Sequence, residues 1–200
     1  KSSPSKAIAY AFTTSDRRVL HGYKLPSRGS AASGAVLFIQ GNQTLVKTIA
    51  DKLEPLAKGF DVFTLDFRGY GQSEGTPRIA ALLSDYGEIT EHLSRSYPHV
   101  FIYGASLGGV VASNLIGSSA GDAFIIDSAP ATAAPFRCPK YIDPLMHIPP
   151  SSCKQLLFIS GGRDRVVKFD KTRPLLDKAA ACGATLIVEP NWTHPFMGPQ

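Results

Sequence analysis

Residues 100–111, VFIYGASLGGVV, decide how the rest of the chain is organised. A strand-length apolar run leads into GASLG at residues 104–108, and a helical pattern of small residues follows. In this context of strand, sharp turn and helix, the G-x-S-x-G pattern presents a reactive serine. A Cβ atom two residues before or after the serine would clash with the crossing strand and helix. We therefore expect Ser106 to occupy a strained turn, with its hydroxyl clear of the sheet and near a helix N-terminus. A glycine-rich turn without chemistry is the alternative interpretation.

Strand-length apolar runs alternate with helical patterns on both sides of this turn. Runs such as AVLFI at residues 35–39 lack polar alternation, which is typical of parallel strands covered on both faces. The alternation predicts one α/β domain over residues 1–200, with a mostly parallel central sheet, helices on both faces and an N-terminal antiparallel hairpin. Strands are expected over 7–13, 18–25, 35–39, 61–66, 123–126, 155–160 and 185–188, and helices over 43–58, 79–97 and 171–182.

Composition narrows the class of protein. The net charge is +5, and the 21 Lys and Arg residues are scattered, so no basic stripe indicates nucleic-acid binding. No apolar run reaches membrane-spanning length, and no N-terminal segment has the pattern of a signal peptide. We therefore expect neither a nucleic-acid partner nor a membrane span, and we take a monomer as the default.

Three cysteines occur without C-x-x-C or metal-ligand spacing. Cys138 and Cys153 bracket a proline-rich stretch and are the candidates for a disulfide in an oxidising compartment, with free thiols as the alternative. Cys182 is expected to be a buried small hydrophobe. The candidate bridge and the start at Lys1 rather than methionine favour a secreted or periplasmic protein only slightly over a cytoplasmic one.

Four stretches, taken in order, resemble the α/β-hydrolase superfamily over nearly the whole chain. They are GASLG at residues 104–108, LDFRGYGQSEG at 65–75, FISGGRDRVV at 158–167, and a lone histidine after the last strand. The order Ser106, Asp164, His194 is similar to the family's Ser…Asp…His order. Within the superfamily, the pattern looks most like compact serine hydrolases of the esterase and acyl-thioesterase kind.

Two departures from the family pattern bear on the site. Relatives usually carry His-Gly ahead of the oxyanion residue, whereas this chain has Gln40-Gly41-Asn42. The donor there is a backbone N–H, so the change need not abolish the oxyanion hole. In place of the family's crossover helix and frequent lid, residues 128–152 contain six prolines, which leave room for only short helical turns. We therefore expect little or no lid and an open site.

A serine hydroxyl needs an adjacent base to become a nucleophile at neutral pH. His194 follows the last strand at the edge where catalytic loops gather, so it is the expected base. His147 lies in the proline-rich segment and is a candidate for lining the pocket. The other histidines, on elements expected to lie away from the serine, are His21, His92 and His99.

The base needs a carboxylate to fix its tautomer. Asp164 follows strand 155–160 after two glycines, where the resemblance places the acid. Asp127, after the preceding strand, is the competitor, and Asp143 is a remote third choice. The resemblance also implies that the backbone N–H groups of Asn42 and Leu107 form the oxyanion hole.

The expected function is a serine hydrolase that cleaves esters of short or medium acyl chain, with a small-molecule or acylated substrate and no metal or organic cofactor. Alternatives are an acyl-thioesterase or a peptidase on the same triad, or a catalytically silent binding protein, which the altered Gln40 favours. Arg68 and Ser73 are expected to be structural. Trp192 and Phe196 flank the histidine and are expected to pack its loop, with lining of the acyl pocket as the alternative.

Overall fold

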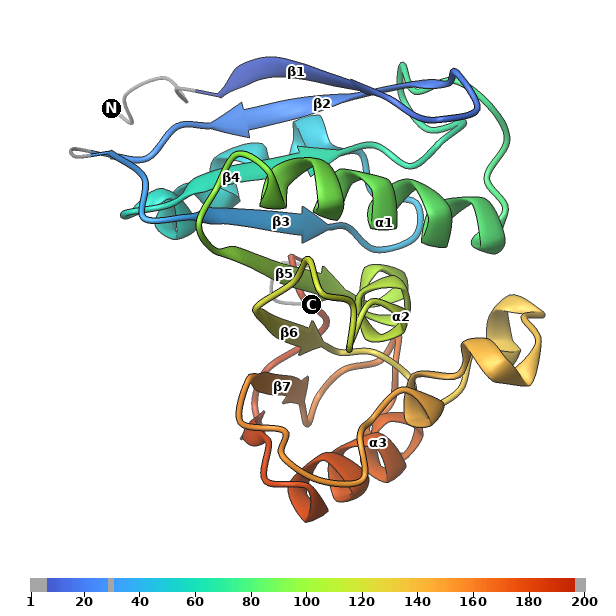
Figure 1. The fold of residues 1–200 in the computed structure, drawn as a ribbon. Coiled ribbons are helices and arrows are strands. Elements are labelled where there is room, and N and C mark those ends of the chain that lie inside the picture. Colours follow the sequence, from blue (N-terminus) through green and yellow to red (C-terminus); the bar gives the residue numbers. More distant parts are fainter. Residues whose placement is uncertain (1–6, 29–30, 197–200) are drawn as a thin grey trace.

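The computed structural model describes residues 7–28 and 31–196, which are built around an eight-stranded sheet (Figure 1). The strand order is β1-β2-β4-β3-β5-β6-β7-β8. The β1–β2 and β2–β4 pairs are antiparallel and the remaining five pairs are parallel, which confirms the expected N-terminal hairpin and mostly parallel sheet. The strands are β1 (Ile8–Thr13), β2 (Val19–Leu25), β3 (Ala35–Ile39), β4 (Asp61–Leu65), β5 (Val100–Ala105), β6 (Ala123–Asp127), β7 (Leu156–Gly161) and β8 (Thr185–Glu189).

The α-helices lie where the periodicity predicts them, with one exception. They are α1 (Ile79–Ser94), α2 (Leu107–Asn114) and α3 (Phe169–Ala181). The helix expected over 43–58 is instead two 3₁₀ segments, η1 (Val46–Thr48) and η2 (Ala50–Ala57). Pro55 lies inside η2 and has no N–H to donate, so it removes one backbone hydrogen bond that an α-helix over 43–58 would need. None of the helices in the described part of the chain has the length and apolar character of a membrane span.

Helices cover the two faces of the sheet unequally. Ile102, Phe124 and Phe158 belong to the large core that the buried sides of α1, α2 and α3 complete. Phe38 points to the other face, where Leu53 of η2 packs in a smaller cluster. Figure 1 shows α1 and α2 in front of the sheet, with the 3₁₀ turns behind β4. Both faces carry helical cover as predicted, but the second face has only these short turns.

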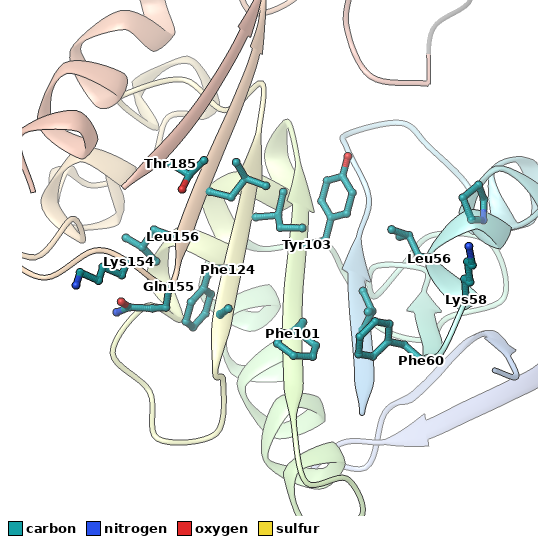
Figure 2. A pocket seen from close by; sticks show the side chains of 15 residues that line it. Leu56, Lys58, Phe60, Phe101, Tyr103, Phe124, Lys154, Gln155, Leu156 and Thr185 are labelled. Atoms are coloured by element: carbon teal, nitrogen blue, oxygen red, sulfur yellow. The ribbon is translucent and has the colours of Figure 1, made fainter. Parts of the chain in front are cut away.

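An apolar groove of about 590 Å³ runs along the thinly covered face (Figure 2). Phe101 and Tyr103 project into it from β5, and Phe60 closes one side. Lys58 and Lys154 lie at its rim. Its lining does not include Ser106.

The cysteines pair differently from the prediction. Cys153 forms a disulfide with Cys182, and Cys138 is free. Cys153 lies just before β7 and Cys182 just before β8; since these strands are parallel neighbours, their starting ends lie side by side. Cys182 is buried, as expected of a small hydrophobe, but it is bonded to Cys153.

The proline-rich segment contains only short helical turns, as expected. These are η3 (Ala134–Phe136), η4 (Lys140–Ile142) and η5 (Pro144–Met146), seen as the yellow and orange turns in Figure 1. The segment does not form a helical lid, which confirms that expectation for the described residues.

The five parallel strand pairs bring four loops to one edge of the sheet. Asn42 follows β3, Ser106 follows β5, Asp164 follows β7 and His194 follows β8. Because the carboxyl ends of parallel strands meet at the same edge, the fold gathers these residues from distant parts of the sequence.

Candidate active site

Ser106 occupies the sharp turn between β5 and α2. Its φ of 57° and ψ of −116° are unusual for a residue with a side chain, and strained backbone of this kind clusters at functional sites. Its N–H donates to the carbonyl of Asp127 at 2.8 Å, and its own carbonyl accepts from the N–H of Gly109 at 2.9 Å. The turn is therefore held on both sides, to β6 and to the first turn of α2.

The glycines on either side of Ser106 are needed for close packing. A Cβ atom on Gly104 would lie 2.2 Å from the carbonyl oxygen of Gly108. A Cβ atom on Gly108 would lie 2.0 Å from the carbonyl oxygen of Ile39, at the end of β3. Both contacts involve backbone atoms, so no side chain can move aside. The clash with strand and helix predicted from the sequence is present at both positions.

His194 and Asp164 form a buried pair at the same edge. The distance from His194 Nδ1 to Asp164 Oδ2 is 2.7 Å, and their side chains are 10% and 1% exposed. The N–H groups of Val166 and Val167 donate to the other carboxylate oxygen at 2.8 and 2.9 Å. Burial raises the pKa of Asp164, but the hydrogen bonds from His194 and the two N–H groups outweigh it and hold the pKa below its ordinary value. The carboxylate therefore stays ionised and fixes the orientation of the imidazole.

Asp127, the competing acid, is engaged elsewhere. Tyr103 donates its hydroxyl to Asp127 Oδ2 at 2.8 Å, and Ser128 donates to Oδ1 at 3.0 Å. Burial raises the pKa of Asp127. The side chain of Asp143 accepts the N–H of Ala133 at 2.7 Å and so supports the proline-rich segment. Of the three carboxylates considered, the one bonded to His194 is Asp164.

Ser106 and His194 line one cavity of about 690 Å³, together with Asn42. Among the described residues, no hydrogen bond joins the Ser106 hydroxyl to His194; such contacts are often long before substrate binds. The structure thus brings serine, histidine and the proposed oxyanion residue to one cavity, with Asp164 behind the histidine.

The strand-end segment Gln40-Gly41-Asn42 passes close to the serine. A Cβ atom on Gly41 would lie 3.3 Å from Ser106 Cβ, so the backbone here borders the nucleophile. Tyr70 donates its hydroxyl to Asn42 Oδ1 at 2.7 Å. Gln40 is fully buried, with its side-chain oxygen 3.4 Å from the Tyr86 hydroxyl, whose proton goes to the carbonyl of Leu65 at 2.7 Å. Among the described residues, its Nε2 atom has no hydrogen-bond partner. Leu107 is the first residue of α2, where backbone N–H groups have no acceptor within the helix.

The aromatic residues beside His194 differ in their roles. Phe196 packs against Phe38, with ring centroids 5.3 Å apart, and also lines the cavity. Trp192 is 52% exposed, so the expectation that it packs the loop was wrong for this residue. His147, the candidate for lining the pocket, lies outside the cavity lining and contacts the carbonyl of Tyr141 through Nε2 at 2.9 Å.

The glycine-rich loop after β4 is structural, as predicted. The Arg68 guanidinium pairs with the buried Asp85 and with Asp16, with a 2.9 Å contact to the latter. The Ser73 hydroxyl donates to the carbonyl of Asp66 at 2.9 Å and accepts the N–H of His21. No group of three His, Cys, Asp or Glu residues suited to a metal ion occurs in the described ranges.

Sequence reasoning missed two cationic side chains in the cavity. Lys52 comes from η2 and Lys171 from α3, more than a hundred residues apart in sequence. No local pattern marks either lysine, because their proximity depends on how η2 and α3 pack around the sheet edge.

A family model described as "Serine aminopeptidase, S33" matches residues 30–155 of this chain. A curated relative, the uncharacterized protein YfhR of Escherichia coli K12, is 31% identical over 144 residues, which are 66% of this chain and 50% of that protein. The α/β-hydrolase domain-containing protein WAV2 of Arabidopsis thaliana is 29% identical over 113 residues, which are 51% of this chain and 35% of that protein. The chain thus spans half or less of the length of these curated relatives.

Solved structures share the fold across most of the chain. The Pyrococcus furiosus esterase Pf2001 superimposes with a TM-score of 0.74 at 20% identity, covering 98% of this chain and 88% of that one. XC6422 from Xanthomonas campestris, described as an α/β serine hydrolase without a lid, gives 0.74 at 18% identity, covering 97% and 88%. Esterase 2 of Thermogutta terrifontis gives 0.78 at 17% identity, covering 96% and 85%. At these identities the likeness establishes the fold.

Proposed function

The chain belongs to the serine aminopeptidase S33 family of the α/β-hydrolase superfamily, and from that premise we propose that it hydrolyses carboxylic esters through an acyl-enzyme on Ser106. The observation that carries the proposal is one cavity lined by a serine in a strained turn and by a histidine whose far nitrogen is bonded to a buried carboxylate. A nucleophile, a base and a group that orients the base are the three parts that covalent catalysis by serine requires.

In the first half-reaction, Ser106 Oγ attacks the ester carbonyl carbon while its proton passes to His194 Nε2. Asp164 holds the Nδ1–H, so the Nε2 lone pair faces the proton, and the carboxylate stabilises the imidazolium that forms. The tetrahedral intermediate then expels the alcohol, which leaves with the proton from His194. Water repeats these steps on the acyl-enzyme, so that the carboxylic acid leaves and Ser106 recovers its proton.

The negative charge that develops on the carbonyl oxygen needs donors fixed in advance. We assign this role to the backbone N–H groups of Asn42 and Leu107. The approach of the Gly41 backbone to Ser106 and the position of Leu107 at the start of α2 support the assignment. One such donor is typically worth roughly 2.7–4 kcal/mol in the transition state.

The proposed acyl chain is short or medium. The cavity of about 690 Å³ is in the size range of small-molecule sites, and the residues at 128–152 form only short turns beside it. Apolar side chains of Phe136, Val166 and Val167 line one part of the cavity and suit a hydrocarbon chain.

An aminopeptidase is the second candidate, favoured by the serine aminopeptidase family to which the chain belongs. The same serine, histidine and aspartate would attack an amide carbonyl, and the enzyme would also have to hold the free ammonium of a peptide N-terminus. Hydrolysis of aminoacyl p-nitroanilides, compared with p-nitrophenyl esters, separates the two candidates.

The test is hydrolysis of p-nitrophenyl esters from acetate to palmitate by the wild type and by Ser106→Ala. We expect an optimum among the short or medium chains and a loss of at least about three orders of magnitude in kcat for the variant. Ser113→Ala is the matched control, because that hydroxyl lies on α2, close in sequence to Ser106, but donates to the carbonyl of Gly109. Equal rates for wild type and Ser106→Ala would refute the proposal and leave the silent binding protein as the better account.

A further inference from the structure

The cavity beside Ser106 has cations on two of its walls. Lys52 contributes from η2 and Lys171 from α3. Among the described residues that line this cavity, none is an aspartate or a glutamate. The nearby carboxylate of Asp164 is buried and bonded to His194, so it does not offset the lysine charges toward the cavity interior.

The Lys52 ammonium is held near the reacting groups. Its Nζ donates to the carbonyl of Phe196 at 3.1 Å, and Phe196 follows His194 by two residues. One hydrogen bond to a carbonyl leaves two N–H donors of the ammonium for a ligand. Lys52 therefore offers positive charge and free donors beside the histidine loop.

Lys171 is placed on another wall. Its carbonyl accepts the N–H of Ala131 at 2.8 Å, which ties the start of α3 to the chain beside Pro130, itself a lining residue. Its Nζ lies 3.3 Å from Asp170, but both side chains are about two-thirds exposed, and such pairs contribute little. A substrate carboxylate in the cavity can therefore compete for this ammonium.

The surrounding charge has the same sign. The segment 163–171 carries four cationic side chains, those of Arg163, Arg165, Lys168 and Lys171. Its two carboxylates are Asp164, which is paired with His194, and Asp170. The whole chain has a net charge of +5. A cleft lined by one sign of charge concentrates ligands of the opposite sign.

We propose that the preferred substrates are esters whose acyl group ends in an ionised carboxyl group, that is, monoesters of dicarboxylic acids. The hydrocarbon part lies against Phe136 and Val166, and the carboxylate reaches Lys52 and Lys171, which act as specificity-determining residues. This inference rests on the proposed ester hydrolysis. The same two ammonium groups repel the N-terminal ammonium of a peptide, so this inference also favours an esterase over an aminopeptidase.

The test compares two esters of equal acyl length, p-nitrophenyl hexanoate and mono-p-nitrophenyl adipate, as a ratio of kcat/KM values. Each exposed lysine–carboxylate pair is typically worth roughly 1.4- to 5-fold, so the adipate-to-hexanoate ratio should fall by roughly 2- to 30-fold in Lys52→Met/Lys171→Met. In 1 M salt, where the screening length is about 3 Å, the wild-type ratio should fall toward that of the double variant. A ratio cancels any general damage that the substitutions cause.

Lys154→Met is the matched control, because this lysine lies at the starting end of β7, in the groove of Figure 2, and does not line the Ser106 cavity. Its ratio should equal that of the wild type. If the protein hydrolyses the hexanoate ester but Lys52→Met/Lys171→Met leaves the adipate-to-hexanoate ratio unchanged, this inference alone is overturned. If the protein turns over neither ester and a fluorophosphonate does not label Ser106, the proposed function is overturned, and this inference with it.

Discussion

The substitution Gly108→Ala tests the close packing that shapes the serine turn. The added Cβ would lie 2.0 Å from the carbonyl oxygen of Ile39 and 2.6 Å from that of Gln40, whereas ordinary contacts begin at 3.4 Å. Because both atoms are backbone at the end of β3, α2 and β3 would have to separate by about 1.4 Å. Overpacking of this kind costs about 1–3 kcal/mol or more.

The consequences are measurable in stability and in activity. At about 2–4 °C per kcal/mol for a chain of this size, a 3 kcal/mol loss lowers the melting temperature by roughly 6–12 °C. The shift also separates Ser106 from Asn42, which follows β3, and a misplacement of about 1 Å commonly costs 10²-fold in rate. We therefore expect kcat/KM for a p-nitrophenyl ester to fall by about 100-fold or more.

Gly87→Ala in α1 is the matched control, since it is also a helical glycine but its Cβ would meet only Leu115 Cδ2, at 4.0 Å. This change should stabilise the protein by about 0.5–1 kcal/mol and leave kcat/KM unchanged. Thermal unfolding followed by circular dichroism, with ester kinetics on the same samples, measures both variants. A Gly108→Ala protein with the melting temperature and kcat/KM of the wild type would refute the packing argument.

Three further predictions concern the acid and the disulfide. Asp164→Asn should lower kcat by about 10³- to 10⁴-fold, because the amide no longer fixes the His194 tautomer. Asp127→Asn should change kcat less than tenfold. Comparable losses of kcat in both variants would contradict the assignment of the acid. The pKa of Asp164 is lower in the folded protein than in the unfolded chain. Its contribution to the free energy of unfolding should therefore be fully present at a pH above the ordinary carboxyl pKa, and be lost as the pH falls through the lower pKa of the folded protein. Replacing Cys153 and Cys182 by alanine should lower the free energy of unfolding by about 3.5 kcal/mol for a closed loop of this length, and so lower the melting temperature by roughly 7–14 °C. An unchanged melting temperature would show that the bridge does not constrain the unfolded chain.

The features predicted best from the sequence are those encoded by short contiguous patterns. The turn at Ser106 is defined by two glycines and the apolar run before it, and its strained φ is present as expected. The pairing of Asp164 with His194 follows from strand order, since both residues follow neighbouring parallel strands.

The features that the sequence did not predict depend on contacts between distant segments, or on a single residue that opposes the pattern of its neighbours. Apolar spacing favoured an α-helix over 43–58, but Pro55 removes one of the backbone hydrogen bonds such a helix would need, and the segment forms two 3₁₀ segments instead. Proximity in sequence favoured Cys138 as the partner of Cys153, but the parallel pairing of β7 and β8 brings Cys182 there instead. The cationic walls of the cavity also depend on tertiary packing.

The central claim is that Ser106 is an activated nucleophile, and covalent labelling tests it most directly. The protein is treated with a fluorophosphonate and the modified peptide is identified by mass spectrometry. We expect one adduct, on Ser106, that forms slowly in His194→Gln and not at all in Ser106→Ala. A folded wild-type protein that remains unlabelled, or that carries the adduct on another residue, would contradict the claim.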